Sequence, residues 1–201
     1  MKQEKIVGFF GGTFDPIHFG HINLVLEIKE KQGLDEVLFC PAALSPHKLQ
    51  KPPFASAAER LTLVQLAISD IPGFSVTDLE INRGGISYTI DTLRALYQQK
   101  TEKVQLRLII AQDSIQHFSQ WREYKEILNI APPLIGIRAD FPTELPDFLK
   151  KNLVKTNKME IDGTRIRERL KKGLYCGHLL PAKVLDYIYK HQLYCSQING
   201  F

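Results

Sequence analysis

The sequence predicts an α/β fold built on a doubly wound parallel sheet, and three observations lead to this prediction. Apolar runs of strand length alternate, almost from end to end, with stretches whose apolar residues recur at helical spacing. Such alternation is typical of βαβ units, whose helices cover both faces of the sheet. The 201 residues, 44% of them hydrophobic, suffice for one core without disulfides, so we expect a single domain over residues 1–201.

The first half of the chain shows two strand–helix units. A buried strand is expected at Ile6–Phe10, where an apolar run ends at two glycines, and a striped helix follows from about Gly20 to Lys31. A second strand at Glu36–Cys40 is stopped by Pro41. The next helix starts at a capping box, in which a serine and a glutamate each satisfy a free amide; the box is Ser56-Ala57-Ala58-Glu59.

The second half continues the alternation. Phe74–Ile81 alternates like a strand, and Ser87 is a suitable N-cap for a helix that runs through Tyr97. Val104–Ala111 is the most apolar predicted strand, and Leu134–Ile137 is another. We therefore expect five strands before the C-terminal part of the chain.

From about residue 160 the chain is expected to be helical. One helix over Thr164–Lys172 ends at Gly173, a suitable C′ residue, and Pro181 opens the last helix at its N1 position. Two proline-rich stretches are expected to be loops over the carboxyl edge of the sheet, where ligands bind in this fold class: they are 41–53 and 132–146.

The composition is that of an ordinary soluble protein and excludes several function classes. With 26 Lys and Arg against 22 Asp and Glu, the net charge of +4 suits an anionic small molecule but is too small to indicate a nucleic-acid binder. No apolar run approaches the roughly 20 residues of a membrane span, and the N-terminus lacks a signal-peptide pattern. Three cysteines without a C-x-x-C pair argue against a zinc site or a disulfide framework. We expect a cytoplasmic protein and leave open whether it forms a homo-oligomer.

The most informative segment follows the first strand and runs Gly-Gly-Thr-Phe-Asp-Pro-Ile-His-Phe-Gly-His, residues 11–21. A turn between a strand and a helix is where phosphates bind in doubly wound folds. This one is neither a Walker loop nor a G-x-G-x-x-G fingerprint. Instead, His18 and His21 stand three residues apart at a helix start, so their rings are expected on one side, over the helix N-terminus.

The residue types in this turn indicate a phosphate site. A helix N-terminus offers about half a positive charge and free N–H donors, and two imidazoles add donors that can become cationic. These groups suit a polyphosphate whose charge rises as a P–O bond breaks. Gly20, between the histidines, is expected to let a nucleotide lie close to the backbone, and Asp15 is expected to fix the turn rather than to bind a metal.

Residues 11–21 resemble the signature of the H-x-G-H nucleotidyltransferase superfamily, and the whole string GGTFDPIHFGH resembles that of the nicotinate-nucleotide adenylyltransferase family. Further motifs of that family follow in order to about Arg167. The resemblance implies a Rossmann-like nucleotidyltransferase fold. It also implies that the turn binds ATP, through Gly11, Gly12, Thr13, Phe14, His18, Gly20 and His21.

Two motifs follow the second predicted strand. Pro41 to Lys48 resembles the family's loop that brings a basic group to the triphosphate, which implies a catalytic role for Lys48. Ser87, Tyr88 and Thr89 resemble the family's S-Y-T motif, at a helix start whose free N–H groups suit a carboxylate. The resemblance implies that this tripeptide holds the nicotinate ring.

Two more motifs follow the strand at 104–111. Residues 111–114 resemble G-x-D-S with Ala111 in place of the glycine, which implies that Asp113 accepts hydrogen bonds from the ribose of ATP. Trp121, the only tryptophan, forms with Phe118 a pattern that resembles F-x-x-W. Its indole is suited to stack on the pyridine ring of the mononucleotide.

The last motif lies at the start of the C-terminal helical part. Residues 161–167 resemble I-S-x-T-x-I-R, which implies that Thr164 and Arg167 contact phosphate oxygens of ATP. Asp162 stands where the family has serine, and because a carboxylate repels phosphates, we expect it to cap the helix and turn away. Arg138 matches an arginine that the family places near adenosine.

The implied reaction is adenylyl transfer: the phosphate of nicotinate mononucleotide attacks the α-phosphorus of ATP, giving deamido-NAD and pyrophosphate. The acceptor phosphate has a second pKa of about 6 and is already ionised near neutral pH, so no general base is needed. His18, His21, Lys48 and Arg167 are the residues expected to stabilise charge on the reacting phosphates. No carboxylate pair forms a metal site in the sequence, so Mg²⁺ is expected to arrive with the triphosphate.

Two alternatives stay open. Another adenylyltransferase of the superfamily would use nicotinamide mononucleotide or phosphopantetheine as the acceptor. A non-catalytic nucleotide-binding module would fit the departures at Ala111 and Asp162. A class I aminoacyl-tRNA synthetase shares the H-x-G-H motif, but this chain is short and has no K-M-S-K-S segment.

Overall fold

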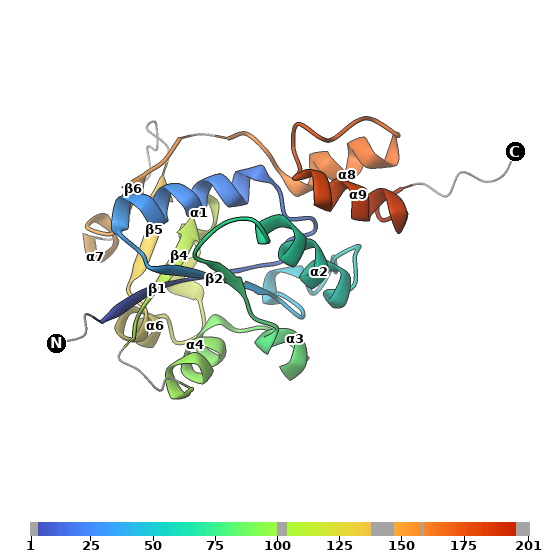
Figure 1. The fold of residues 1–201 in the computed structure, drawn as a ribbon. Helices are drawn as coiled ribbons and strands as arrows, with labels where there is room; N and C mark the ends of the chain where they lie inside the picture. The colour runs from blue at the N-terminus through green and yellow to red at the C-terminus, as the bar shows by residue number, and fades with distance from the viewer. Residues whose placement is uncertain (1–3, 100–103, 138–146, 158, 196–201) are drawn as a thin grey trace, which may run out of the picture.

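The computed structural model of the chain describes residues 4–99, 104–137, 147–157 and 159–195. Within them, six strands form one parallel sheet in the order β3-β2-β1-β4-β5-β6 (Figure 1). The predicted α/β fold with a parallel sheet is therefore confirmed. The strands are β1 (Lys5–Gly12), β2 (Glu36–Pro41), β3 (Phe74–Val76), β4 (Val104–Ala111), β5 (Pro133–Ile137) and β6 (Leu153–Lys155).

Helices cover both faces of this sheet, as Figure 1 shows. One apolar core lies between the sheet and α1, α2, α8 and α9, and a second lies between the sheet and α4 to α7. The longer helices among the described residues are α1 (Phe19–Gln32), α2 (Ala57–Ile68), α4 (Thr89–Gln98), α6 (Tyr124–Ile130), α8 (Gly163–Lys171) and α9 (Ala182–Lys190). The shorter ones are α3 (Leu79–Arg83), α5 (Gln112–Ile115), α7 (Asp147–Lys150) and the 3-10 turns η1 (Pro46–Lys48) and η2 (Phe118–Gln120).

The apolar runs of the central strands are explained by burial on both faces. Successive side chains of a strand point to opposite faces, so Phe9 and Phe10 of β1 belong to different cores. Leu108 and Ile109 of β4 divide in the same way. A strand buried on both faces has no polar positions to alternate with, which is why these strands appear as continuous apolar runs in the sequence.

The strand order places the ligand-binding edge. After β1 the chain builds β2 and β3 on one side of it and then returns to place β4 on its other side. In such sheets the crevice opens beyond the carboxyl ends of the two strands at the reversal. Here those ends are Gly12 of β1 and Ala111 of β4, within the segment 11–21 and at the start of the motif 111–114.

The predicted strand over Phe74–Ile81 is wrong in its second half. β3 ends at Val76, and the chain leaves the sheet to form α3 from Leu79. The helix turns Glu80 inward, where its carboxylate accepts a hydrogen bond from Thr92 Oγ1 at 2.7 Å. The alternating pattern in the sequence therefore continues past a three-residue edge strand into a helix whose buried residue is Glu80.

Other differences concern element ends and short elements. Tyr88, not Ser87, is the N-cap of α4, and Pro181 is the N-cap of α9 rather than its first residue. β5 begins at Pro133, inside the stretch 132–146 that was expected to be a loop. The short elements α6, α7 and β6 were not predicted, because none carries a long periodic pattern.

The three cysteines lie in different environments. Cys40 and Cys176 are buried free thiols, and Cys195 is an exposed one. In the described part of the chain, no helix combines the length and the apolar character needed to cross a bilayer.

Candidate active site

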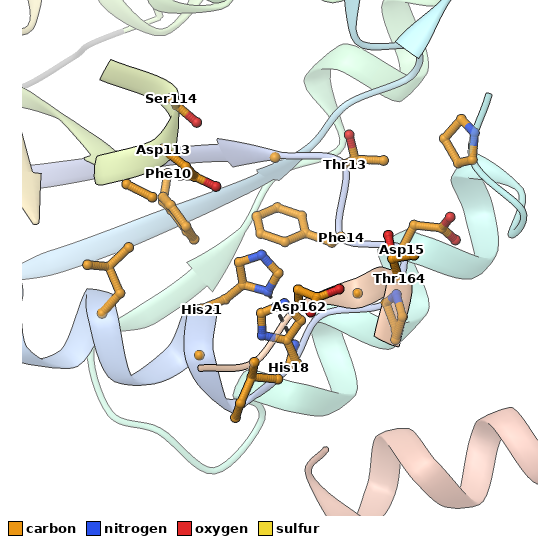
Figure 2. Close-up of a pocket in the computed structure, with 18 of the residues that line it drawn as sticks. Phe10, Thr13, Phe14, Asp15, His18, His21, Asp113, Ser114, Asp162 and Thr164 are labelled. Atoms are coloured by element: carbon orange, nitrogen blue, oxygen red, sulfur yellow. Dashed lines mark hydrogen bonds between the residues drawn. The ribbon is translucent and has the colours of Figure 1, made fainter. Parts of the chain in front are cut away.

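A cavity of about 1120 Å³ opens at the carboxyl edge of the sheet, between the ends of β1 and β4. Figure 2 shows His18 and His21 beside Phe14 in this cavity, with Asp113 and Ser114 coming from α5, the short helix after β4. The cavity brings together most of the residues expected to bind ATP or to act in catalysis. They are Gly11, Gly12, Thr13, Phe14, His18, Gly20, His21, Lys48, Asp113, Thr164 and Arg167.

The β1–α1 turn, residues 13–18, is held by the carboxylate of Asp15. This carboxylate is buried and accepts hydrogen bonds from Phe54 N–H at 2.9 Å, Ala55 N–H at 3.1 Å and the hydroxyl of Tyr194 at 2.8 Å. The peptide bond that follows it, to Pro16, is cis. Asp15 thus fixes the turn, as its sequence position indicated.

The two histidines form one stacked unit at the start of α1. His18 is the N-cap of this helix, and its ring stacks on that of His21, with ring centroids 3.7 Å apart and an angle of 23° between the planes. The backbone N–H of His18 donates to His21 Nδ1 at 3.3 Å. Because Nδ1 is then the acceptor, a neutral His21 ring carries its proton on Nε2. His21 is therefore prepared as an uncharged N–H donor.

Burial favours the neutral form of both imidazoles near pH 7. Desolvation lowers the pKa of His18 from 6.5 to about 4, although the nearby Asp162 carboxylate acts in the opposite direction. Desolvation also lowers the pKa of His21 well below 6.5, and His18 adds to this effect. His18 Nδ1 is buried and has no hydrogen-bond partner among the described groups.

Aromatic side chains hold the His21 ring from the other side. The ring meets Phe14 edge to face, with centroids 5.3 Å apart, and Phe10 lies 6.2 Å away. Phe14 has a positive φ of 51° and packs so closely on Gly12 that a Cβ there would lie 2.8 Å from its ring. Gly12 is therefore required for the packing that orients His21.

Gly20 has a packing role inside the protein. A Cβ at this position would lie 3.0 Å from His18 Nδ1 and 3.5 Å from Ile161 Cβ. The space that the missing side chain leaves is thus occupied by the protein itself. Gly20 therefore admits the stacked His18 ring. Gly20 also lines the cavity, and its expected role in leaving room for a nucleotide stays a prediction.

The two expected cationic groups stand in different environments. Lys48, in η1, is exposed at the rim of the cavity. Arg167 is partly buried: its Nη1 donates to the backbone oxygen of Asp15 at 2.6 Å, and its Nη2 donates to Thr164 Oγ1 at 3.1 Å. Its guanidinium also lies over the ring of Phe54 at 5.0 Å. Arg167 therefore ties α8 to the β1–α1 turn in addition to lining the cavity.

Asp162 caps α8, as expected, but it does not leave the cavity. Its carboxylate accepts a hydrogen bond from Arg165 N–H at 2.8 Å. It remains among the residues that line the cavity, and it is close enough to influence the pKa of His18. The expectation that this carboxylate turns away from the site is therefore wrong.

The end of β4 supplies the remaining polar groups. α5 begins directly after Ala111 and presents the exposed carboxylate of Asp113 to the cavity. Trp121 also lines the cavity and packs on the buried ring of Phe118, with centroids 5.3 Å apart. The indole is partly exposed, so one surface remains available to a ligand.

The S-Y-T tripeptide is not part of the lining of this cavity. Ser87 is buried, and its Oγ accepts a hydrogen bond from Ala43 N–H at 3.0 Å. The ring of Tyr88 lies beneath the guanidinium of Arg122 at 4.9 Å. The role of Ser87, Tyr88 and Thr89 in binding the mononucleotide stays a prediction, and Arg138 lies outside the described residues.

The motifs left out several residues that line the cavity: Lys51, Phe54, Met159, Lys171 and Tyr194. Lys51 was within reach of the sequence argument, because it follows Lys48 in the same proline-rich loop. Tyr194 was not, since it reaches Asp15 from a position 179 residues away. Among the described residues, no three His, Cys, Asp or Glu side chains converge in a way that could hold a metal ion.

Comparison with known proteins agrees with this geometry. The family model described as cytidylyltransferase-like matches residues 9–169. A protein from Dehalococcoides mccartyi named probable nicotinate-nucleotide adenylyltransferase is 41% identical over 199 residues, covering 94% of this chain and 97% of that protein. Proteins of the same name from Herpetosiphon aurantiacus and Salmonella arizonae are 38% and 36% identical, covering 94% and 96% of this chain and 98% and 100% of their own.

Solved structures with the same fold include nicotinic acid mononucleotide adenylyltransferase of Plasmodium falciparum. Its complex with NaAD matches at a TM-score of 0.77 and 21% identity, covering 95% of this chain and 98% of that one. Its complex with APC matches at a TM-score of 0.73 and 20% identity, with the same coverage. These structures support the fold, and the sequence relatives identify the family. The chain belongs to the nicotinate-nucleotide adenylyltransferase family, within the cytidylyltransferase-like group.

Proposed function

We propose that this protein transfers the adenylyl group of ATP to nicotinate mononucleotide, forming deamido-NAD and pyrophosphate. The observation that carries the proposal is the stacked pair of His18 and His21 at the N-terminus of α1, in the cavity between the ends of β1 and β4. A helix N-terminus with two additional N–H donors is suited to phosphates. Family membership selects the reaction among those that phosphate sites support.

In this mechanism the acceptor phosphate attacks the α-phosphorus directly. Its second pKa is about 6, so it is ionised near neutral pH and no side chain has to remove a proton. The work of the protein is to align the two substrates and to stabilise the charge that develops on the pyrophosphate. We assign the stabilisation of that charge to His21 Nε2–H and to the free amides at the start of α1.

The groups around the histidines complete the phosphate site. Lys48 at the rim adds a flexible ammonium group, and Arg167 with Thr164 adds donors from the start of α8. Asp113 faces the cavity where a ribose hydroxyl would lie if adenosine occupied the end of β4. Mg²⁺ would enter on the triphosphate, since this ion keeps waters and phosphate oxygens as ligands, and it would supply further neutralisation of phosphate charge.

Pyrophosphate release tests the proposal. The protein is incubated with ATP and, separately, with nicotinate mononucleotide, nicotinamide mononucleotide, phosphopantetheine or no acceptor. Release that requires both ATP and the acid mononucleotide supports the proposed function, and faster release with the amide or with phosphopantetheine assigns a different acceptor. Binding of ATP without release under any condition would identify a non-catalytic nucleotide-binding module.

Trp121→Ala is expected to raise KM for the mononucleotide between about two- and tenfold, because aromatic stacking contributes about 0.5–1.5 kcal/mol beyond burial. KM for ATP should stay near the wild-type value. Steady-state kinetics with one substrate varied at a time measure both constants, and Tyr97→Ala, at an exposed aromatic residue outside the cavity lining, is the control. An increase in KM for ATP alone would contradict the assignment of Trp121 to the mononucleotide subsite.

Gly20→Ala is expected to cost about 1–3 kcal/mol of unfolding free energy, the usual cost of overpacking, and to lower kcat. The added methyl group meets the His18 ring at 3.0 Å and so disturbs the stacked pair. Urea titration and kcat measure the two effects. Gly33→Ala is a matched control: φ is 61° there and nothing lies within 4 Å of the added Cβ, so stability should fall while kcat is kept. Equal kcat values in both variants would contradict the prediction.

A further inference from the structure

Arg60 is a charged residue at a position where the helical pattern calls for an apolar one. It lies on the buried side of α2, in line with Leu63, Val64 and Ala67. Only 1% of its surface is exposed. Burial lowers the pKa of the guanidinium, and the neighbouring Asp15 carboxylate opposes this effect. The side chain therefore needs hydrogen-bond partners inside the protein.

The partners of Arg60 are three backbone carbonyls from separate segments. Nη1 donates to Thr13 O at 2.7 Å, in the β1–α1 turn. Nη2 donates to Ala43 O at 3.1 Å, in the loop after β2, and Nε donates to Ala55 O at 3.3 Å, just before α2. One planar guanidinium thus sets the separation of two loops that come from neighbouring strands.

The loop after β2 is held from its other side by the start of α4. Ala43 N–H donates to Ser87 Oγ at 3.0 Å, and Ser87 N–H donates to Leu44 O at 2.8 Å. A continuous series of hydrogen bonds therefore runs from Thr13 through Arg60 and Ala43 to Ser87. In the proposed function, Thr13 belongs to the ATP site, and Ser87 opens the segment expected to hold the mononucleotide.

Stability alone does not account for an arginine at this position. Burying an ion costs several kcal/mol, and apolar side chains of similar volume often replace buried charges without loss of stability. What arginine adds is geometry, because its donors point in fixed directions within one plane. A lysine has one flexible ammonium group and cannot hold three carbonyls in the same relative positions.

We propose that Arg60 is a positioning residue that sets the distance between the β1–α1 turn and the loop after β2, and thereby aligns the acceptor phosphate with the α-phosphorus of ATP. This inference rests on the proposed function. Arg60 does not line the cavity, so it acts through the loops and not by contact with a substrate.

The test compares wild type with Arg60→Met, Arg60→Lys and the control Arg107→Met. Arg107 is partly buried, and its Nε donates to a backbone carbonyl, Pro132 O, at 3.0 Å, but it lies outside the cavity lining. Arg60→Met is expected to lower kcat by about 10²-fold, the cost of misplacing reacting groups by about 1 Å. The Kd of each substrate, measured separately by calorimetry, should stay near the wild-type value, because each loop keeps its own contacts.

Arg60→Lys keeps the charge and is expected to show a smaller loss of kcat with the same unchanged Kd values. Arg107→Met should lose unfolding free energy in urea titration and keep kcat, which separates positioning from stability. If Arg60→Met does not fold, Arg60→Lys decides by the same criterion. Two outcomes in the Arg60 variants would overturn this inference but not the proposed function: wild-type kcat in Arg60→Lys, or a change in KM without a loss of kcat. An equal loss of kcat in Arg107→Met would do the same. A wild-type protein that releases no pyrophosphate would instead overturn the proposed function, and the inference with it.

Discussion

Replacing His21 with alanine is expected to lower kcat by about 10²–10³-fold, the typical cost of losing one donor that meets developing charge in a transition state. The structure defines that donor: Nδ1 accepts the His18 N–H, so Nε2 carries the proton. His18 and Phe14 hold the ring at centroid distances of 3.7 and 5.3 Å, so the donor is already oriented before the substrates bind. KM for either substrate should change much less, because the interaction strengthens as charge develops.

The His21 result has two controls. His21→Gln places an uncharged amide donor near the position of Nε2 and is expected to recover part of the lost kcat. His191→Ala removes a histidine that stacks on Tyr187 at 4.1 Å, outside the cavity lining, and should keep kcat. Steady-state pyrophosphate release measures all three variants. A kcat near that of wild type in His21→Ala would remove this residue from the mechanism.

Acidification from pH 7 to pH 4 is expected to cost on the order of 3 kcal/mol of unfolding free energy through His18 alone. Burial lowers its pKa from 6.5 to about 4, with Asp162 opposing. Between these two pH values the unfolded chain binds more protons than the folded one. This contribution to stability is therefore complete above pH 6.5 and is lost as the pH falls toward 4. His21, whose pKa burial also lowers, acts in the same direction.

Urea titration at a series of pH values measures this dependence. His18→Gln removes the titrating ring, so its unfolding free energy should vary less with pH between 6.5 and 4 than that of wild type. His47→Gln, at an exposed histidine of η1, should show the wild-type dependence. If His18→Gln and wild type lose stability in parallel, the buried imidazole is not the group responsible.

The features predicted correctly from the sequence are those that depend on neighbouring residues. Continuous apolar runs gave β1, β2 and β4 because these strands are buried on both faces. The capping box at Ser56 is confirmed, since both of its hydrogen bonds join residues three positions apart. The two histidine rings could be placed on one side of α1 for the same reason, because they stand three residues apart. The edge strand β3, in contrast, was predicted too long.

The features that the sequence could not show depend on segments far apart in the chain. The Asp15 carboxylate accepts hydrogen bonds from residues 39, 40 and 179 positions away in the sequence. Arg60 donates to Thr13 O, which lies 47 positions away. The neutral state of His18 and His21 follows from desolvation, which a local pattern does not contain. The space at Gly20 is likewise filled by His18 and Ile161, the latter from the C-terminal part of the chain.

The sequence by itself therefore determined the order of the longer strands and helices, the H-x-G-H turn and the family, because hydrophobic period, capping and motif spacing are properties of short segments. Only the tertiary structure decided the protonation state of the histidines, the anchoring of the turn by Asp15, Tyr194 and Arg167, and the bridging position of Arg60. Burial and hydrogen bonding between distant segments control these properties, and both exist only after the sheet has brought the loops to one edge.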